Sequence, residues 1–293
     1  MEPFTLESFP IDEAFPPGCW NEFLWLYQEQ ASIFHTREWM LTLKDAFGFK
    51  PMVLMAMGLD GGTFFAAIPY MVQSAMGFTI ARSMPFDTYG GPIGSPEYFD
   101  ALEKGFLNLD HTIRRVVDFR KFGDVSTEIV DLTPNLDDIW FSVNKKTRTA
   151  IRNAATKDVE IYPAGKYVNI MDKVSGKIME SLWKNMVPPG KCTFMIAELN
   201  NEVVAESVYF HYGNEAMYWA NTVTPEGRAA NANHLMMWEE ITTAKKMGCK
   251  TLNLGASPDG ADSLVKFKKS WGSKTHPYSR RQEIFSLRRL FHG

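Results

Sequence analysis

The order of hydrophobic runs and turn residues between positions 52 and 85 predicts three consecutive β-strands. Asp60-Gly61 separates the first two runs and is typical of a tight hairpin turn. A helix is expected just before them, because Trp39, Leu43 and Phe47 recur on one helical stripe, after the capping residue Thr36 and before Gly48. The three expected strands are Met52–Gly58, Thr63–Gln73 and Phe78–Ser83.

The same order of elements returns 140 positions later in the chain. Met52–Pro85 aligns without a gap to Cys192–Pro225, which places Asp60-Gly61 on Asn200-Asn201 and Leu43 on Trp183. Identity is low, and what matches is the order of helix, strand, tight turn, strand, turn, strand and proline. A repeat of this length indicates a duplicated domain. The second copy is expected to contain a helix at Ser175–Met186, strands at Thr193–Leu199, Val203–Tyr212 and Ala216–Val223, a helix at Asn233–Met247, a buried strand at Thr251–Leu254, and a short helix capped by Asp262.

Strands and helices mixed at this spacing predict an α/β (α+β) fold with two tandem domains. Each domain is expected to be a mixed, largely antiparallel sheet flanked by helices. The length of 293 residues also suggests about two domains. We place the first domain at residues 1–133 and the second at residues 134–293.

The charge is uneven along the chain. Eight basic residues and one acidic residue follow position 265, a net charge of +7, which leaves −10 on the rest of a chain whose net charge is −3. This tail indicates either a site for a phosphate-bearing ligand or a solvated basic surface. Three scattered cysteines favour a reducing compartment over a disulfide framework, and no signal peptide or membrane span is expected, so we predict a cytoplasmic protein.

Several kinds of chemistry have no sequence support. The chain has no phosphate-binding Gly-x-x-x-x-Gly-Lys-Ser/Thr loop and no dinucleotide-binding Gly-x-Gly-x-x-Gly after a strand. The six histidines form no i, i+4 pair, so no metal site is expected. No general base is evident, and Glu198, Glu206 and Asp259 are candidates only because they lie near expected strand ends.

The order helix, three antiparallel strands, loop, helix and strand, present twice, resembles the GNAT acyltransferase unit. That unit places the pyrophosphate of its donor on backbone N–H groups at the start of its central helix, where the helix dipole favours anions. The corresponding segment is Thr224–Asn233, which contains Arg228 and ends at Asn233. Ala-Ala-Asn-Ala follows Arg228 where the family has glycines, and this departure argues against ordinary acyl-CoA binding.

Further motifs narrow the resemblance to FemAB-like proteins of the compact branch. Residues 267–272, Phe-Lys-Lys-Ser-Trp-Gly, match the family pattern Phe-Lys-x-x-Phe-Gly with Trp as the second aromatic. Asn253-Leu254-Gly255 and residues 144–154 look like other parts of the second domain of these proteins. The loop Tyr89-Gly90-Gly91 is similar to a loop of the first domain. The resemblance covers about Phe34 to Tyr278.

The resemblance implies an N-acyltransferase or aminoacyltransferase that acts on an amine of a cell-envelope precursor, such as a peptidoglycan precursor, or of a polysaccharide. It implies no tightly bound cofactor; the donor is either aminoacyl-tRNA or acyl-CoA, and the acceptor is a small molecule, a glycan or a peptide. Two alternatives stay open. One is an acyl-CoA-dependent GNAT N-acetyltransferase acting on a small-molecule or sugar amine, and the other is a non-catalytic module that binds phosphoglycan or RNA. The oligomeric state is not predicted.

The family match makes Lys268 the expected catalytic cation, which would meet the developing oxyanion. An exposed helix lysine or a phosphate clamp is the alternative. Lys145, Arg148 and Arg152 share one helical face, which suits a diphosphate or an RNA backbone, although a solvated helix face has the same pattern. Phe267 could stack on a base or sugar or pack in the core, and Tyr89 could contact the acceptor or fill a turn. The expected substrate-binding residues are Lys145, Arg148, Arg152, Tyr89, Gly90, Gly91, Phe267, Arg228 and Asn233.

Overall fold

The computed structural model describes residues 2–11, 17–75, 77–86, 88–119, 121–123, 125–166, 176–258 and 260–284. The chain divides into two compact units. One contains the chain up to Val125 together with the segment from Pro277 onward, and the other is Ser126–His276. This division differs from the expected boundary at residues 133 and 134, because the chain passes from one unit to the other twice.

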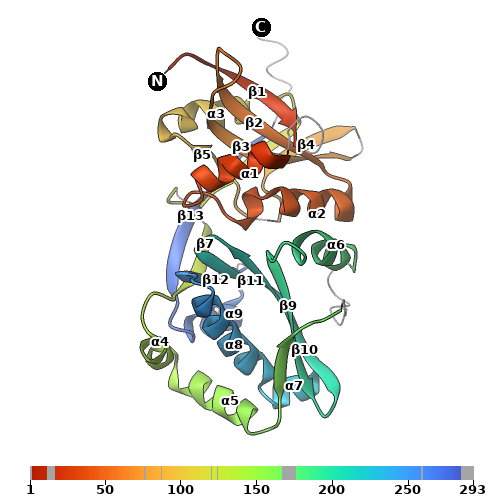
Figure 1. The fold of residues 1–293 in the computed structure, drawn as a ribbon, viewed down its shortest axis with the longest axis vertical. Coiled ribbons are helices and arrows are strands. Elements are labelled where there is room, and N and C mark those ends of the chain that lie inside the picture. The colour runs from red at the N-terminus through yellow and green to blue at the C-terminus, as the bar shows by residue number, and fades with distance from the viewer. Residues whose placement is uncertain are drawn as a thin grey trace. The chain divides into compact units, whose positions relative to one another are not determined.

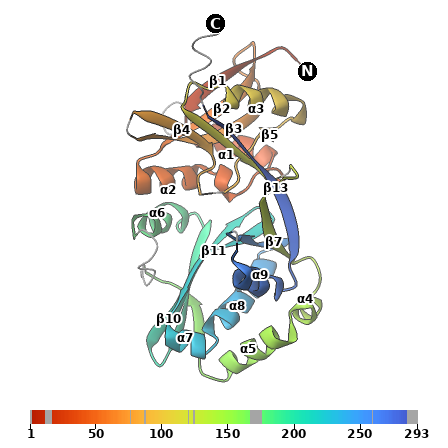
Figure 2. The same cartoon turned by 180° about the vertical axis from the view of Figure 1, so that it is seen from behind.

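The first unit is a mixed, largely antiparallel sheet with helices on both faces (Figures 1 and 2). Strands β1 to β4 are antiparallel neighbours, β6 joins β4 in parallel, β13 joins β6 in antiparallel orientation, and the short β5 pairs with β3. The strands are β1 (Phe4–Pro10), β2 (Lys50–Gly58), β3 (Phe64–Ala75), β4 (Phe78–Ser83), β5 (Ile93–Gly94), β6 (Ile113–Asp118) and β13 (Lys274–Ile284), and the helices are α1 (Pro17–Leu26), α2 (Arg37–Phe47) and α3 (Phe99–Leu107).

The second unit has the strand order β7-β12-β11-β10-β9-β8. Met195 of β9 faces the core formed with α8, whereas the neighbouring Phe194 lies 5.4 Å from the ring of Trp183 in α6. Successive strand residues point to opposite faces, so α6 and α8 cover opposite faces of this sheet. Its elements are β7 (Val125–Asp131), α4 (Leu136–Ser142), α5 (Lys145–Ala155), β8 (Glu160–Pro163), α6 (Gly176–Met186), β9 (Cys192–Leu199), β10 (Glu202–Tyr212), β11 (Glu215–Val223), α7 (Pro225–Ala229), α8 (Ala232–Lys246), β12 (Thr251–Ala256) and α9 (Asp262–Lys269).

The predicted duplication is confirmed at the level of elements. Hairpin β2–β3 matches hairpin β9–β10, and the aligned turn residues Gly61, Asn200 and Asn201 all have positive φ, the conformation that glycine and asparagine tolerate best. Helix α2 begins after Thr36, whose hydroxyl accepts a hydrogen bond from the Trp39 N–H, as predicted. Asp262 does not cap α9, because the N-cap is Ala261 and makes no side-chain hydrogen bond.

Each unit is completed by a strand that follows the other repeat in the sequence. Residues Ser279–Ile284 of β13 pair with β6 in the first unit, and Thr127–Asp131 of β7 pair with β12 in the second. The basic segment after position 265 is therefore not a uniform ligand surface. Within its described part, Lys268 is buried and Arg281 donates to Glu103 Oε1 at 2.8 Å, while Arg288 and Arg289 lie outside the described residues.

Candidate active site

In the second unit, the parallel strands β11 and β12 pair only at their beginnings, and the regular ladder then stops. Only Glu215–Met217 pair with Thr251–Asn253, although β11 continues to Val223 and β12 to Ala256. Main-chain groups of β11 that face β12 beyond Met217 therefore have no ladder partner on β12. Ligands of α/β sheets commonly bind beyond the carboxyl ends of parallel strands, where neighbouring strands diverge.

The first unit has no matching opening in its described part. There β4 and β6 pair in parallel from Ile80 to Ser83, which is the last residue of β4. The two repeats thus share an order of elements but differ at the position where a ligand would enter. We take the β11–β12 opening as the candidate active site.

Both strands that border the opening are irregular. In β11, Tyr218 pairs with Tyr209 and Ala220 pairs with Val208, so Trp219 is an extra residue that forms a bulge. In β12, the pairing with β7 jumps from Asn253–Ile129 to Ala256–Thr127, and Gly255 lies between them with φ 75°. Bulges re-aim main-chain groups and are common beside active sites.

Lys268 lies beneath the end of β12 and not in open solvent. It is 3% exposed, and its Nζ donates to the carbonyl oxygens of Gly255 at 2.8 Å and Ala256 at 2.7 Å. Burial lowers the pKa of Lys268 to about 8, while the charge of Glu128 acts in the opposite direction. Glu128 is itself held by the hydroxyls of Ser273 and Thr275 at 2.6 and 2.7 Å.

The first turn of α8 lies against β11 and α9. Burial raises the pKa of the Tyr218 hydroxyl, and a hydrogen bond from the Asn233 side chain opposes this shift. The other polar atom of that side chain, Asn233 Oδ1, is buried and has no hydrogen-bond partner. Burial also lowers the pKa of His234, whose ring centroid lies 5.7 Å from that of Phe267 and 6.2 Å from that of Trp271. The sequence predicted a binding role for Asn233 and Phe267 but for neither Tyr218 nor His234.

Asn231 can take the place of one of the glycines that the family pattern has after Arg228. It precedes α8 with φ 60° and ψ 27°, the left-handed conformation that glycine usually supplies. The alanines on either side of it, Ala230 and Ala232, are buried. The backbone conformation at this point is therefore available without glycine, since asparagine tolerates it. Arg228 lies nearby in α7 and is exposed.

The three cations on α5 differ in what they contact. Arg148 Nη1 donates to the carbonyl oxygens of Trp140 at 3.3 Å and Phe141 at 3.0 Å, near the C-terminal end of α4. The Arg152 guanidinium lies 5.2 Å from the ring centroid of Trp140, while Lys145 is exposed. Two of the three predicted phosphate ligands thus help to fix α4 on α5, a packing role that the sequence did not separate from binding.

Tyr89, Gly90 and Gly91 belong to the first unit, and the structure does not support acceptor contact by Tyr89. That side chain is 4% exposed and stacks on Phe119 with 4.3 Å between ring centroids. A Cβ on Gly90 would lie 2.1 Å from Ser83 Oγ, and Gly91 has φ 78°. These glycines are explained by close backbone packing.

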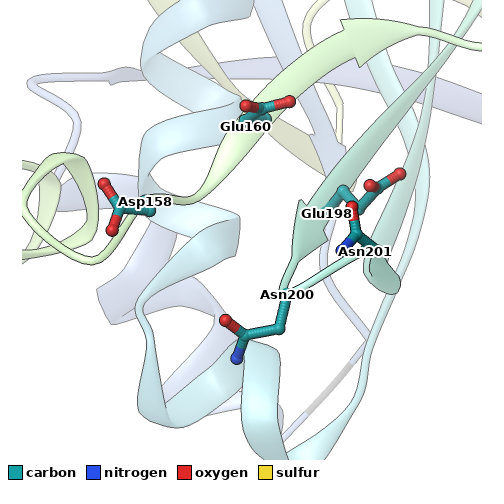
Figure 3. Close-up of a pocket in the computed structure, with 5 residues that line it drawn as sticks. All are labelled: Asp158, Glu160, Glu198, Asn200 and Asn201. Atoms are coloured by element: carbon teal, nitrogen blue, oxygen red, sulfur yellow. The ribbon is translucent and has the colours of Figure 1, made fainter.

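A shallow pocket of about 200 Å³ lies elsewhere in the second unit, at its edge strand β8 (Figure 3). Glu160 and Glu198 are directly opposite each other on β8 and β9, and Tyr162 donates its hydroxyl proton to Glu198. Of the three candidate general bases, Glu198 therefore lies on β9 beside the edge strand and not on β11 or β12. Glu206 is buried in β10, and Asp259 lies outside the described residues. No group of three or more metal-ligating side chains occurs among the described residues. The pocket is lined by Asp158, Glu160, Glu198, Asn200 and Asn201.

Comparison with protein families identifies the region around the opening. Residues 146–269 match the model described as "Acetyltransferase (GNAT) domain", and this segment contains β11, β12, α8 and α9. The second unit carries a GNAT acyltransferase domain. This match supports the predicted acyltransferase.

Solved structures extend the GNAT-type likeness to nearly the whole chain. FemX is 12% identical with a TM-score of 0.72, over 98% of this chain and 99% of that chain. A tandem GNAT protein from the clavulanic acid biosynthesis pathway is 12% identical with a TM-score of 0.58, over 97% and 100%. L-PGS from Bacillus licheniformis is 12% identical with a TM-score of 0.52, over 94% and 93%. These likenesses confirm the predicted tandem GNAT fold.

No sequence among the curated proteins matches the chain. Within the described residues, every helix is too short or too polar to cross a membrane.

Proposed function

We propose that this protein transfers an acyl or aminoacyl group to an amine of a cell-envelope precursor or polysaccharide, with the second unit as the catalytic unit. The observation that carries this proposal is the β11–β12 opening inside the segment that matches a GNAT domain. In the reaction, the amine nitrogen attacks the carbonyl carbon of an ester or thioester and the bond to the leaving oxygen or sulfur breaks. The nitrogen loses a proton, and the leaving oxygen or sulfur gains one, so that an amide and a free alcohol or thiol are formed. Holding both reactants in line supplies much of the rate enhancement.

The residues around the opening supply the groups that such a reaction needs. Beyond Met217, β11 no longer pairs with β12, and its edge on that side offers main-chain N–H donors and C=O acceptors to an extended donor, as a neighbouring strand would. Asn233 of α8 contacts Tyr218 of β11 and has a buried amide oxygen without a hydrogen-bond partner, and Phe267 of α9 packs beside His234 against the core of the unit. Arg228 and Lys145 are exposed cations for donor phosphates, and Lys268 supports the β12 side.

The identity of the donor divides the proposal into two forms. The FemAB-like resemblance of the sequence motifs implies an aminoacyl-tRNA donor and a cell-envelope acceptor, and the fold shared with FemX agrees with it. Acyl-CoA is the second candidate, and the left-handed Asn231 at the start of α8 favours it, because its side chain makes no capping hydrogen bond that would compete with a pyrophosphate for the first N–H groups of the helix. A small-molecule or sugar amine is the acceptor in that form.

A donor-transfer assay tests both forms. Purified protein is incubated with radiolabelled acetyl-CoA or aminoacyl-tRNA and a panel of amines that includes a UDP-linked muropeptide and glucosamine. We expect transfer from one donor class, strongly reduced in Lys268→Met at a donor concentration below KM and unchanged in Lys269→Met, whose side chain is exposed. Absence of transfer and of donor binding with both classes contradicts the proposal.

A further inference from the structure

The end of β12 leaves the regular ladder at a defined point. Its pairing with β11 stops at Asn253, and its pairing with β7 is interrupted between Asn253 and Ala256. Gly255, with φ 75°, lies inside this interruption. A chain that leaves a sheet in this way frees main-chain groups, and buried groups of this kind need new partners.

Asn253 supplies the partners on one side of the interruption. Its side chain is fully buried, and its Oδ1 accepts from the Gly255 N–H at 2.9 Å and from the Thr127 hydroxyl at 2.6 Å. Its Nδ2 donates to Glu215 Oε2 at 3.2 Å. The side chain therefore connects β12 to β7 and β11 at the last residue at which β12 pairs with β11.

Lys268 supplies the partners on the other side. Its Nζ donates to the carbonyl oxygens of Gly255 and Ala256 at 2.8 and 2.7 Å, which accounts for two of its three protons. With only 3% of the residue exposed, the ammonium group is committed to this strand end. Hydrogen bonds from an ionised donor are stronger than those from a backbone N–H group. The two contacts therefore favour the interrupted strand over one in which these carbonyls pair with β11.

We propose that Asn253 and Lys268 are positioning residues that together hold the interruption in β12 and so keep the β11–β12 opening in shape for the donor. Lys268 then acts on the reaction through Gly255 and Ala256, in place of the direct contact with the oxyanion that its motif suggested. This inference rests on the proposed function, since it assigns the opening to the acyl donor. The hydrogen bonds of Asn253 and Lys268 can be tested separately in the full chain without added donor.

Hydrogen exchange followed by mass spectrometry tests the arrangement in the full chain without a ligand. We compare wild type, Asn253→Ala, Lys268→Met and Lys268→Arg, with Lys269→Met as the matched control. We expect amides in Leu254–Ser257 to exchange about tenfold faster or more in Asn253→Ala and Lys268→Met, with α8 unchanged. The N–H groups of arginine can also donate to two carbonyl oxygens, so exchange in Lys268→Arg is expected to lie between that of wild type and that of Lys268→Met. Exchange in Lys269→Met is expected to match wild type. Should Lys268→Met fail to fold, Lys268→Gln, which keeps one donor group, is measured in its place.

Kinetics with the donor that the transfer assay identifies gives the second readout. A positioning role raises the donor KM in both Asn253→Ala and Lys268→Met, whereas direct stabilisation of the oxyanion lowers kcat with little change in KM. Loss of kcat in Lys268→Met with wild-type exchange at Leu254–Ser257 overturns the inference, and so does wild-type exchange in Asn253→Ala. If wild type transfers from neither donor class, the proposed function fails, while the exchange data still decide whether the two residues hold the strand end.

Discussion

Lys268 gives a prediction about stability that needs no substrate. Its pKa falls from 10.5 to about 8 on folding, because its ammonium group leaves water for the space beneath β12. Between these two pH values the unfolded chain binds a proton at this position that the folded chain has released. Unfolding then takes up a proton, so the folded state gains stability as the pH rises from 8 toward 10.5. Below pH 8 both states are protonated and the gain disappears.

The size of the effect follows from the shift. Each pKa unit corresponds to about 1.4 kcal/mol. The contribution of Lys268 to the free energy of unfolding is therefore about 2 kcal/mol larger at pH 10 than at pH 7. Lys268→Met removes the titrating group while filling similar volume. The difference in unfolding free energy between wild type and this variant should therefore move by about 2 kcal/mol in favour of wild type over this range. Other titrating groups cancel in the difference.

The measurement must report on the second unit alone, because two units need not unfold together. Cys192 and Cys249 are buried in the second unit, whereas Cys19 is exposed in the first. Thiol labelling of Cys192 and Cys249 along a urea gradient, analysed by mass spectrometry at pH 7, 8, 9 and 10, gives the required free energies. The labelling rate of the unfolded chain at each pH is the reference. If the difference in unfolding free energy between wild type and Lys268→Met does not depend on pH, Lys268 is not a buried lysine with a lowered pKa.

Two further predictions concern other parts of the structure. Glu160→Lys replaces one member of the directly opposed Glu160–Glu198 pair with the opposite charge, so we expect the second unit to gain about 0.2–1 kcal/mol in urea unfolding, with transfer unchanged; a loss of stability would contradict the repulsion. Gly90→Ala places a Cβ 2.1 Å from Ser83 Oγ, so the first unit should lose about 1–3 kcal/mol while labelling of Cys192 stays at the wild-type rate. Wild-type stability in Gly90→Ala would show that this loop does not pack closely.

Elements with strong local signals were predictable from the sequence. Thr36 and Gly48 mark the ends of α2, and the paired turns at Gly61 and Asn200-Asn201 reveal the duplication. The strands β1, β6, β8 and β13 were not predicted. In β13 the pairing partner is β6, more than 150 residues earlier, and charged side chains such as Arg280 and Arg281 hide the strand pattern. The exchange of β7 and β13 between the units has no local signal at all.

The site was predictable only as a list of side chains. The motif located Lys268 and Asn253, but sequence spacing could not show that Lys268 turns toward the carbonyls of Gly255 and Ala256. Neither could it show that Arg148 binds the end of α4, or that Tyr89 is enclosed by aromatic rings. The opening itself depends on where two strands stop pairing whose paired residues, such as Glu215 and Thr251, are far apart in the sequence, and this is a property of the assembled sheet.

The central claim is that the activated donor binds in the β11–β12 opening of the second unit. Hydrogen exchange of the wild-type protein with and without saturating acetyl-CoA, and separately with an aminoacyl-tRNA, tests this claim most directly. We predict that one of these donors slows exchange in residues 218–223 and 254–257 and leaves Ile80–Ser83 of the first unit unchanged. Protection at Ile80–Ser83, or none at the opening with either donor, would contradict the account.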